Sequence, residues 1–159
     1  CRITVTGGGV IMNRAATEVL LVDDSVDDVE LAVNVLATYW PAERIITVHD
    51  GAEARDYLDC RGTYANRPPV NPALVLLDIK MPRVDGLDVL RTIKNDQRLK
   101  TIPVVMLSSS REERDVNDSY RGGSNAYVVK PLVFAEFHAA IKKLGAFWLA
   151  TNELPASNT

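Results

Sequence analysis

The stretch "LLVDDS", residues 20–25, runs from apolar residues straight into two adjacent aspartates. The run "VLLV", residues 19–22, contains only Val and Leu, which is typical of a buried strand. Adjacent carboxylates repel each other, and an apolar strand does nothing to relieve that repulsion. The stretch therefore raises the question of what Asp23 and Asp24 hold at the end of this strand.

Apolar runs and helical segments alternate along the rest of the chain. From Val29 to Trp40 the apolar residues recur at helical spacing, and Pro41 ends this segment. Ser25, with Asp28 three residues on, resembles a helix-capping box. Strands are predicted at residues 19–22, 44–48, 73–78 and 125–131, and residues 102–110 are predicted to hold a further strand followed by small hydroxyl residues. The later helices are predicted at residues 50–60, 87–96, 111–123 and 134–149.

The order of these elements predicts an α/β fold built from strand–helix units. Four of the strands are apolar throughout rather than alternating, which indicates a parallel sheet covered by helices on both faces. Right-handed crossovers then give a doubly wound, three-layer domain. Residues 61–72 contain Gly, Asn and three prolines and are expected to form a long loop.

Composition narrows the class of protein. The chain has 159 residues, 47% hydrophobic and 25% charged, which is typical of one globular domain. A formal net charge of −3 argues against nucleic acid or an anionic membrane as a partner. Cys1 and Cys60 give no disulfide framework, so a cytoplasmic location is expected. No apolar run approaches the roughly 20 residues of a membrane span.

The domain is expected to span residues 17–150. Residues 1–16 show no periodicity, and we expect them to be disordered or an extended leader. Residues 151–159 are polar and are expected to form a C-terminal tail. No output domain is expected after residue 150, so the output should be a protein contact.

Polar side chains stand at the ends of the predicted strands. Asp23 and Asp24 follow the first strand, Asp78 ends the third, Ser108 follows the fourth, and Lys130 ends the fifth. Because the carboxyl ends of parallel strands form one edge, we expect these side chains to converge. Three close carboxylates need a cation, and an oxygen-only ligand set favours Mg²⁺.

A metal ion, an ammonium group and a hydroxyl together suit a phosphoryl group, whose oxygens they neutralise and hydrogen-bond. A carboxylate can itself be the nucleophile and form an aspartyl phosphate. Asp78 is the predicted nucleophile, because it lies centrally and alone at the end of its strand.

The segments "LLVDDS", "LVLLDIKMPRVDG", "PVVMLSSS" and "AYVVKP" resemble, in order and spacing, the receiver domain of two-component response regulators over residues 17–145. The resemblance implies a flavodoxin-like fold with strand order 2-1-3-4-5. It also implies that Asp78 accepts phosphate from a phosphohistidine of a sensor kinase. Mg²⁺, or Mn²⁺ or Ca²⁺ in its place, would be held by Asp24, Asp78 and the Lys80 backbone carbonyl, with Asp23 acting mainly through water.

The same resemblance assigns roles in switching. Lys130 would pair with the phosphoryl group, and Ser108 would hydrogen-bond to it and move inward, followed by Tyr127. Pro131 resembles the family's cis-proline, which would help to aim Lys130. The changed surface, formed by residues 111–149, would bind an unknown downstream protein or a second copy.

A finer resemblance is to small stand-alone receivers that partner bacterial phytochromes, carried by "HDGAEARDYLDCRGTYANRP" and "FWLATNELP". It implies a phytochrome as the sensor kinase and a homodimer. Phe147, Trp148, Leu149 and Leu154 would then form an exposed apolar patch for self-association, the alternative being that they cap the core.

Two other functions stay open. A phosphohydrolase could also use an aspartyl-phosphate nucleophile, but it needs a second Asp two residues after the first, where Lys80 stands. A receiver-like binding module that takes no phosphate would lack the acceptor or the lysine, and Asp78 and Lys130 are both present. We therefore expect a signalling protein that catalyses only its own phosphorylation and dephosphorylation.

Overall fold

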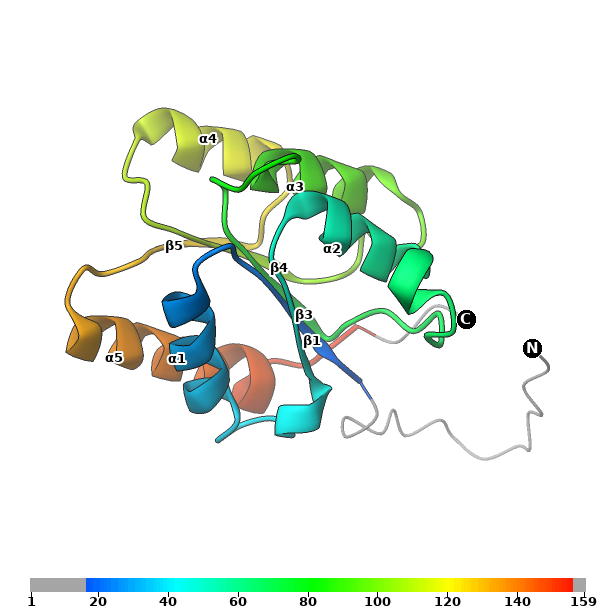
Figure 1. Ribbon diagram of the computed structural model, residues 1–159. Helices are drawn as coiled ribbons and strands as arrows, with labels where there is room; N and C mark the ends of the chain where they lie inside the picture. The colour runs from blue at the N-terminus through cyan, green and yellow to red at the C-terminus, as the bar shows by residue number, and fades with distance from the viewer. Residues whose placement is uncertain (1–16, 156–159) are drawn as a thin grey trace.

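The computed structural model describes residues 17–155, so the predicted leader, residues 1–16, and the end of the tail lie outside the described residues. The core is a parallel sheet of five strands in the order β2-β1-β3-β4-β5, as predicted (Figure 1). The strands are β1 (Val19–Val22), β2 (Ile45–Val48), β3 (Leu74–Leu77), β4 (Val104–Ser108) and β5 (Ala126–Val129).

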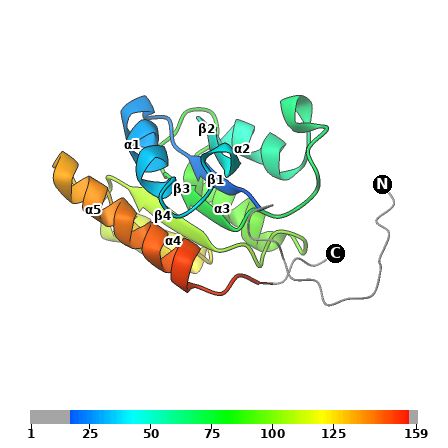
Figure 2. The ribbon, with the colours of Figure 1, turned by 90° about the horizontal axis from the view of Figure 1, so that it is seen from below.

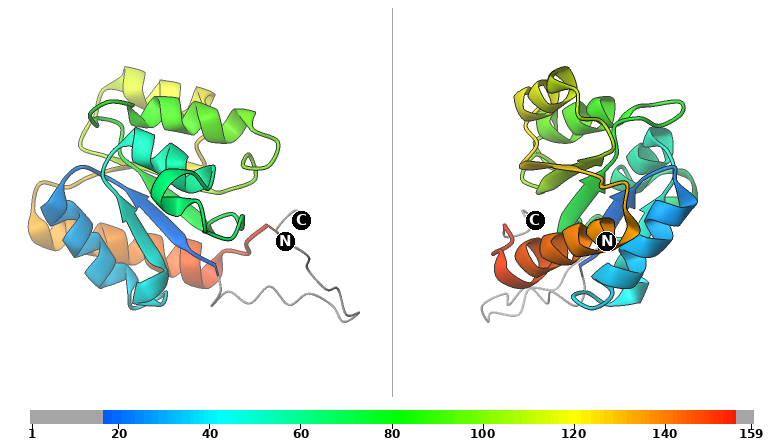
Figure 3. Two further views of the ribbon diagram at one scale, coloured as in Figure 1. Left: turned by 45° about the vertical axis from the view of Figure 1, so that its right-hand side comes forward. Right: turned by 90° about the vertical axis from the view of Figure 1, so that its left-hand side faces the viewer.

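Helices cover the sheet on both sides. Figures 1 and 3 show α1 and α5 on one face and α2, α3 and α4 on the other. The helices are α1 (Val26–Leu36), α2 (Gly51–Leu58), α3 (Gly86–Asn95), α4 (Glu113–Arg121) and α5 (Phe134–Leu144). None of the helices in the described part of the chain is long and apolar enough to cross a membrane.

The sheet separates two hydrophobic cores, which explains the continuous apolar strands. In β1, Val19 and Leu21 pack toward α1 and α5, whereas Leu20 and Val22 pack toward α2 and α3. β3 divides its residues between the two cores in the same way. Every residue of these central strands is therefore buried, whichever face it points to.

Helix α1 begins as the sequence predicts but ends earlier. The Ser25 hydroxyl accepts a hydrogen bond from the Asp28 N–H at 3.4 Å, which makes Ser25 the N-cap. The helix stops at Leu36, and Trp40 follows in a turn. The Trp40 indole N–H donates to the Thr17 carbonyl at 2.9 Å, and the ring is buried although Trp40 lies beyond the end of the helix.

The predicted loop after α2 is held in place by an arginine. It contains a short 3-10 turn, Gly62–Tyr64, and the Arg67 guanidinium lies 3.8 Å from the centre of the Tyr57 ring. Arg67 also pairs with Glu18, whose carboxylate accepts a short hydrogen bond from the Tyr57 hydroxyl. This cluster fastens the loop to the end of the sheet that lies away from the strand-end aspartates.

The C-terminal end of α5 continues into a π-helical segment, Gly145–Thr151, which is the red end of the α5 ribbon in the view from below (Figure 2). The predicted apolar patch is only partly present. Leu149 is buried in the core, and Trp148 and Leu154 pack against that core. Phe147 is the exposed member, with 51% of its surface accessible. Leu149 was therefore wrongly predicted to be exposed.

β5, at one edge of the sheet, is the least buried of the five strands. All four residues of β5 are only half-buried. Helix α4 buries the small and polar residues Asp115 and Ser119, while the aromatic Tyr120 is exposed. An element with so little buried apolar surface has low local stability.

Candidate functional site

Strand register brings the aspartates together. Val22 of β1 lies opposite Leu77 of β3, so Asp23 and Asp78 follow at neighbouring positions on the same edge of the sheet. The Asp78 N–H donates to the Val22 carbonyl at 2.9 Å, which extends the strand pairing to the acceptor residue itself. The backbone of the sheet therefore fixes where both carboxylates stand.

Three carboxylates form a compact cluster at this edge. Asp23, Asp24 and Asp78 each offer an oxygen, and these oxygens lie within 4.8 Å of one another. Asp23 and Asp78 are buried, whereas Asp24 is exposed. A cation held here would be bound by the protein on one side and open to water or phosphate oxygens on the other.

Lys130 supplies the positive charge of the cluster. Its ammonium nitrogen lies 2.5 Å from an oxygen of Asp23, 3.2 Å from Asp78 and 3.0 Å from Asp28. The backbone N–H of Lys130 also donates to the Ser108 carbonyl at 2.8 Å, which joins the ends of β5 and β4. The structure therefore brings together all four of the predicted ionic residues, Asp23, Asp24, Asp78 and Lys130.

Asp28 is a member of this site that the sequence analysis missed. Its position in a capping box accounted for it locally, and nothing in the spacing pointed to Lys130. A signal was available, because α1 starts directly after β1. The first turn of such a helix lies over the carboxyl ends of the strands, so one of its acidic residues can reach the site, although the sequence does not say which.

Charge and burial act against each other in the pKa values of this site. Burial lowers the pKa of Lys130, but its hydrogen bond to Asp23 and the charges of Asp23 and Asp78 outweigh that effect and raise the pKa overall. Burial raises the pKa of Asp23, although Lys130 and the Ser25 N–H lower it. Burial therefore outweighs the neighbouring positive charge in setting the pKa of Asp23.

The predicted switch residues lie beside the cluster. Ser108 ends β4 and is fully buried, and its hydroxyl oxygen accepts a hydrogen bond from the Ser110 N–H at 3.3 Å. The Tyr127 hydroxyl donates to the Ser110 carbonyl at 2.9 Å. Burial is the main cause of the raised pKa of Tyr127. Tyr127 thus connects β5 to the loop between β4 and α4.

The loop between β3 and α3 lies across the site and carries Lys80. Its ammonium group is exposed, 3.9 Å from a carboxylate oxygen of Asp115 in α4. The loop is held close because the Gly86 N–H donates to the Ile79 carbonyl at 2.8 Å. A Cβ at Gly86 would collide with the Asp78 carbonyl, so only glycine permits this approach.

One expectation for this edge is wrong. Pro131 was expected to follow a cis peptide bond, but none of the peptide bonds in the described residues is cis. The Lys130 side chain reaches the carboxylates with Pro131 in the trans form.

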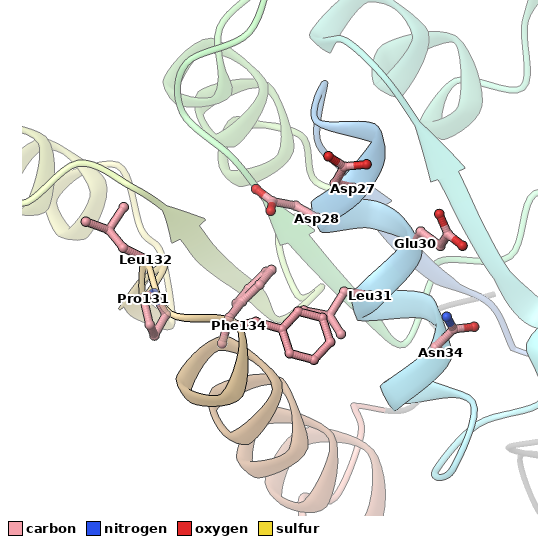
Figure 4. Close-up of a pocket in the computed structure, with 9 residues that line it drawn as sticks. Asp27, Asp28, Glu30, Leu31, Asn34, Pro131, Leu132 and Phe134 are labelled. Atoms are coloured by element: carbon pink, nitrogen blue, oxygen red, sulfur yellow. The ribbon is translucent and has the colours of Figure 1, made fainter.

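A groove beside the site lies between α1 and the start of α5 (Figure 4). Asp28 stands at its end nearest the cluster, and Leu31 and Asn34 line its α1 wall. Its other wall contains Leu132, which is 97% exposed, and Phe134. A groove that joins such exposed apolar side chains to the acidic residues of α1, next to a cluster of charges, is a candidate binding surface.

Comparison with known proteins gives the family. Residues 19–142 match the response regulator receiver domain. The chain belongs to this family. The response regulator Rcp1 of Synechocystis sp. is 39% identical over 139 residues, covering 87% of this chain and 93% of Rcp1. The Mn²⁺-bound form of Rcp1 superposes with a TM-score of 0.82, covering 88% of this chain and 99% of that one.

Two further solved receivers are similar to this receiver domain. The phosphorylated cyanobacterial phytochrome response regulator RcpA is 39% identical, with a TM-score of 0.82 and coverage of 88% of this chain and 99% of that one. The bacteriophytochrome response regulator AtBRR is 50% identical, with a TM-score of 0.66 and coverage of 86% and 98%. The chain is thus a receiver domain of a response regulator.

Replacing Lys130 with Ala is expected to lower the free energy of unfolding of the metal-free protein by about 3 kcal/mol, because buried carboxylates lose their counter-charge. The exposed Lys143 offers a control, whose replacement should change stability by less than about 0.5 kcal/mol. Without Lys130 the carboxylates bind protons more readily in the folded than in the unfolded chain. The deficit should therefore shrink as the pH falls from about 7 toward 4.

Urea unfolding in EDTA at several pH values measures both effects. A deficit that grows on acidification would contradict this account of the site.

Proposed function

We propose that this receiver domain accepts a phosphoryl group on Asp78 from the phosphohistidine of a sensor kinase. The observation that carries the proposal is the place of the Asp78 carboxylate, which lies within 4.8 Å of carboxylate oxygens of Asp23 and Asp24 and 3.2 Å from the Lys130 ammonium. A nucleophilic carboxylate needs this arrangement, because the incoming phosphoryl group brings more negative charge to a site that is already acidic.

In the proposed transfer, an oxygen of Asp78 attacks phosphorus and the bond from phosphorus to the histidine nitrogen breaks. The nitrogen keeps the bonding electrons and takes a proton from solvent. Lys130 balances the charge on a phosphoryl oxygen, and the Asp78 oxygen that accepts the Ile79 N–H at 2.7 Å stays oriented by the backbone. Ser108 offers its hydroxyl to a second phosphoryl oxygen.

The residues present fit a divalent cation, because three carboxylates converge and their oxygens are the ligands that Mg²⁺ prefers. Asp24 and Asp78 would hold it through their side chains, Lys80 through its backbone carbonyl, and Asp23 mainly through water. Mn²⁺ and Ca²⁺ could take its place. A bound cation would neutralise the phosphoryl oxygens during transfer.

We further propose that phosphorylation switches the surface formed by α4, β5 and α5. Two features support this proposal. Tyr127 and Ser110 join β5 to the loop before α4, next to Ser108. Helix α4 buries little apolar surface, so a small change in free energy can shift it. The shifted surface would bind a downstream protein.

For the phosphoryl donor we propose a phytochrome-type sensor kinase in the cytoplasm. Support comes from the similarity to receivers described as phytochrome response regulators. The groove between α1 and α5 adjoins Asp28 and so lies beside the acceptor, which is where a donor histidine must arrive. Its exposed Leu132 and Phe134 offer apolar surface for docking.

The only reactions we assign to the chain are its own phosphorylation and dephosphorylation. A phosphohydrolase acting on other substrates is not favoured, because Lys80 stands where such an enzyme needs a second aspartate. The bound phosphate is therefore a signal rather than an intermediate of turnover.

Replacing Asp78 with Asn should abolish phosphorylation by acetyl phosphate in the presence of Mg²⁺, because the amide is not a nucleophile. Intact-mass spectrometry measures the added phosphate. Asp85→Asn, which changes an aspartate at the start of α3, is the control and should be labelled like the wild type. Labelling of the Asp78 variant at the wild-type level would place the acceptor elsewhere.

Mg²⁺ at ten times its dissociation constant should raise the free energy of unfolding by about 1.4 kcal/mol, because it binds only the folded chain. Asp24→Asn should remove most of this gain, whereas Asp59→Asn, far from the cluster in sequence, should keep it. The gain should fall at lower pH, because burial raises the pKa of Asp23 and protons then compete with the metal. Thermal or urea unfolding with and without Mg²⁺ measures this gain for the wild type and for each variant.

Self-association through the C-terminal segment is a further part of the proposal. Phe147 is exposed and packs edge-on against Trp148, with ring centres 5.1 Å apart. Phe147→Ser should weaken a homodimer without destabilising the fold, since the ring lies outside the core. Sedimentation at matched concentrations measures the association of the Phe147→Ser variant. The control is Tyr120→Ser, which changes an exposed aromatic residue of α4. Equal association of wild type and the Phe147 variant would exclude this segment as the interface.

A further inference from the structure

The contact between Asp28 and Lys130 has no role in the transfer described so far. Asp28 is not part of the carboxylate cluster that suits a cation, and it lies 3.0 Å from the Lys130 ammonium nitrogen. It comes from the first turn of α1, whereas Asp23 and Asp78 follow strands. The contact therefore joins a helix to a side chain that begins at the end of β5.

The three carboxylates around Lys130 match the chemistry of its head group. An ammonium group has three N–H donors, and Lys130 has carboxylate partners in Asp23, Asp28 and Asp78. A lysine side chain has four rotatable carbon–carbon bonds, so two partners leave the position of its ammonium nitrogen loosely defined. A third fixed partner determines where all the donors point.

We propose that Asp28 is a positioning residue that orients the Lys130 ammonium toward Asp78 and the phosphoryl group formed there. The inference rests on the proposed phosphorylation of Asp78. When the phosphoryl group forms, one of its oxygens replaces the Asp78 oxygen as acceptor of one N–H. Asp23 and Asp28 keep the other two donors, so the ammonium meets the new charge without reorganising.

Burial determines which of the partners can be changed cleanly. The side chains of Asp23 and Asp78 are 3% and 9% exposed, whereas that of Asp28 is 34% exposed. Replacing Asp28 therefore leaves the contacts of Lys130 with the buried Asp23 and Asp78 in place and removes only the contact proposed to orient the ammonium group. Asp27 is the matched control, since it is an exposed aspartate on the same first turn. Both residues interact with the helix dipole, so that contribution cancels in the comparison.

Beryllium fluoride, a mimic of the phosphoryl group, tests the inference with the purified chain at saturating Mg²⁺. Calorimetry should show Asp28→Ala binding it about tenfold more weakly than the wild type, the effect of one partly exposed hydrogen bond to a charged group. Asp27→Ala should bind like the wild type. Asp28→Asn should lie between, because its carbonyl oxygen still accepts a hydrogen bond.

A double-mutant cycle shows whether Asp28 acts through Lys130. In a Lys130→Ala background, Asp28→Ala should cause no further loss of beryllium fluoride binding. A second cycle uses urea unfolding in EDTA, where Asp28 and Lys130 should be coupled without any metal. An equal loss in the Lys130→Ala background would mean that Asp28 acts on the cation directly, and would overturn the inference.

The remaining outcomes separate the two proposals. If the wild type fails to bind beryllium fluoride with Mg²⁺, the proposed phosphorylation site fails. If the wild type binds and Asp28→Ala matches Asp27→Ala, phosphorylation stands and the positioning role is overturned. Should Asp28→Ala fold poorly, Asp28→Asn against Asp27→Asn gives the same comparison with a smaller structural change.

Discussion

The site depends on a single buried ammonium group surrounded by carboxylates. Lys130 is 8% exposed and lies within hydrogen-bonding distance of aspartates from three different parts of the chain. Carboxylates brought this close would otherwise repel or take up protons. Because Asp23 and Asp78 follow β1 and β3 whereas Asp28 belongs to α1, the lysine also joins a helix to the strand ends. The positive charge of Lys130 thus allows the carboxylates to lie close together, and in the proposed transfer it would also balance the phosphoryl group.

The parallel sheet turns this local chemistry into a defined geometry. Strand pairing places Val22 opposite Leu77, and the residues that follow inherit that alignment. The two cores hold the register, because a shift of one residue would move every strand side chain into the opposite core. Positions of the carboxylates are therefore set by apolar packing well below them rather than by contacts among the acids. The apolar cores can therefore hold the fold even though the carboxylates at the edge of the sheet repel one another.

Residues at the ends of strands could be placed from the sequence, because one rule connects their position in the chain to their position in the sheet. Asp23, Asp78 and Lys130 end strands, and the ends of parallel strands share an edge, so their meeting could be foreseen. Asp28 could not be foreseen in the same way, because its contact depends on how a helix is rotated over the sheet. The docking of Arg67 on Tyr57 likewise depends on the path of a loop.

Expectations taken from family resemblance had mixed outcomes. The strand order is confirmed, since it follows from crossovers and helix placement that a whole sequence encodes. The cis form of Pro131 is wrong, and Leu149 is buried rather than exposed. Both concern single residues near the end of the sheet or of α5, where periodicity carries little information. A π-helical turn rotates the residues after Leu144 away from the spacing of an α-helix.

Helix α5 has a place in both proposed surfaces, and this sharing limits how the signal can travel. It spans 11 residues, or about 16 Å, whereas a standard protein interface is roughly 30 Å across. A kinase seated on the α1 side and a target seated on the α4 side would therefore overlap on this helix. With both proposed surfaces in use, phosphorylation and target binding would exclude each other in time, and a copy would have to leave the kinase before it could bind its target.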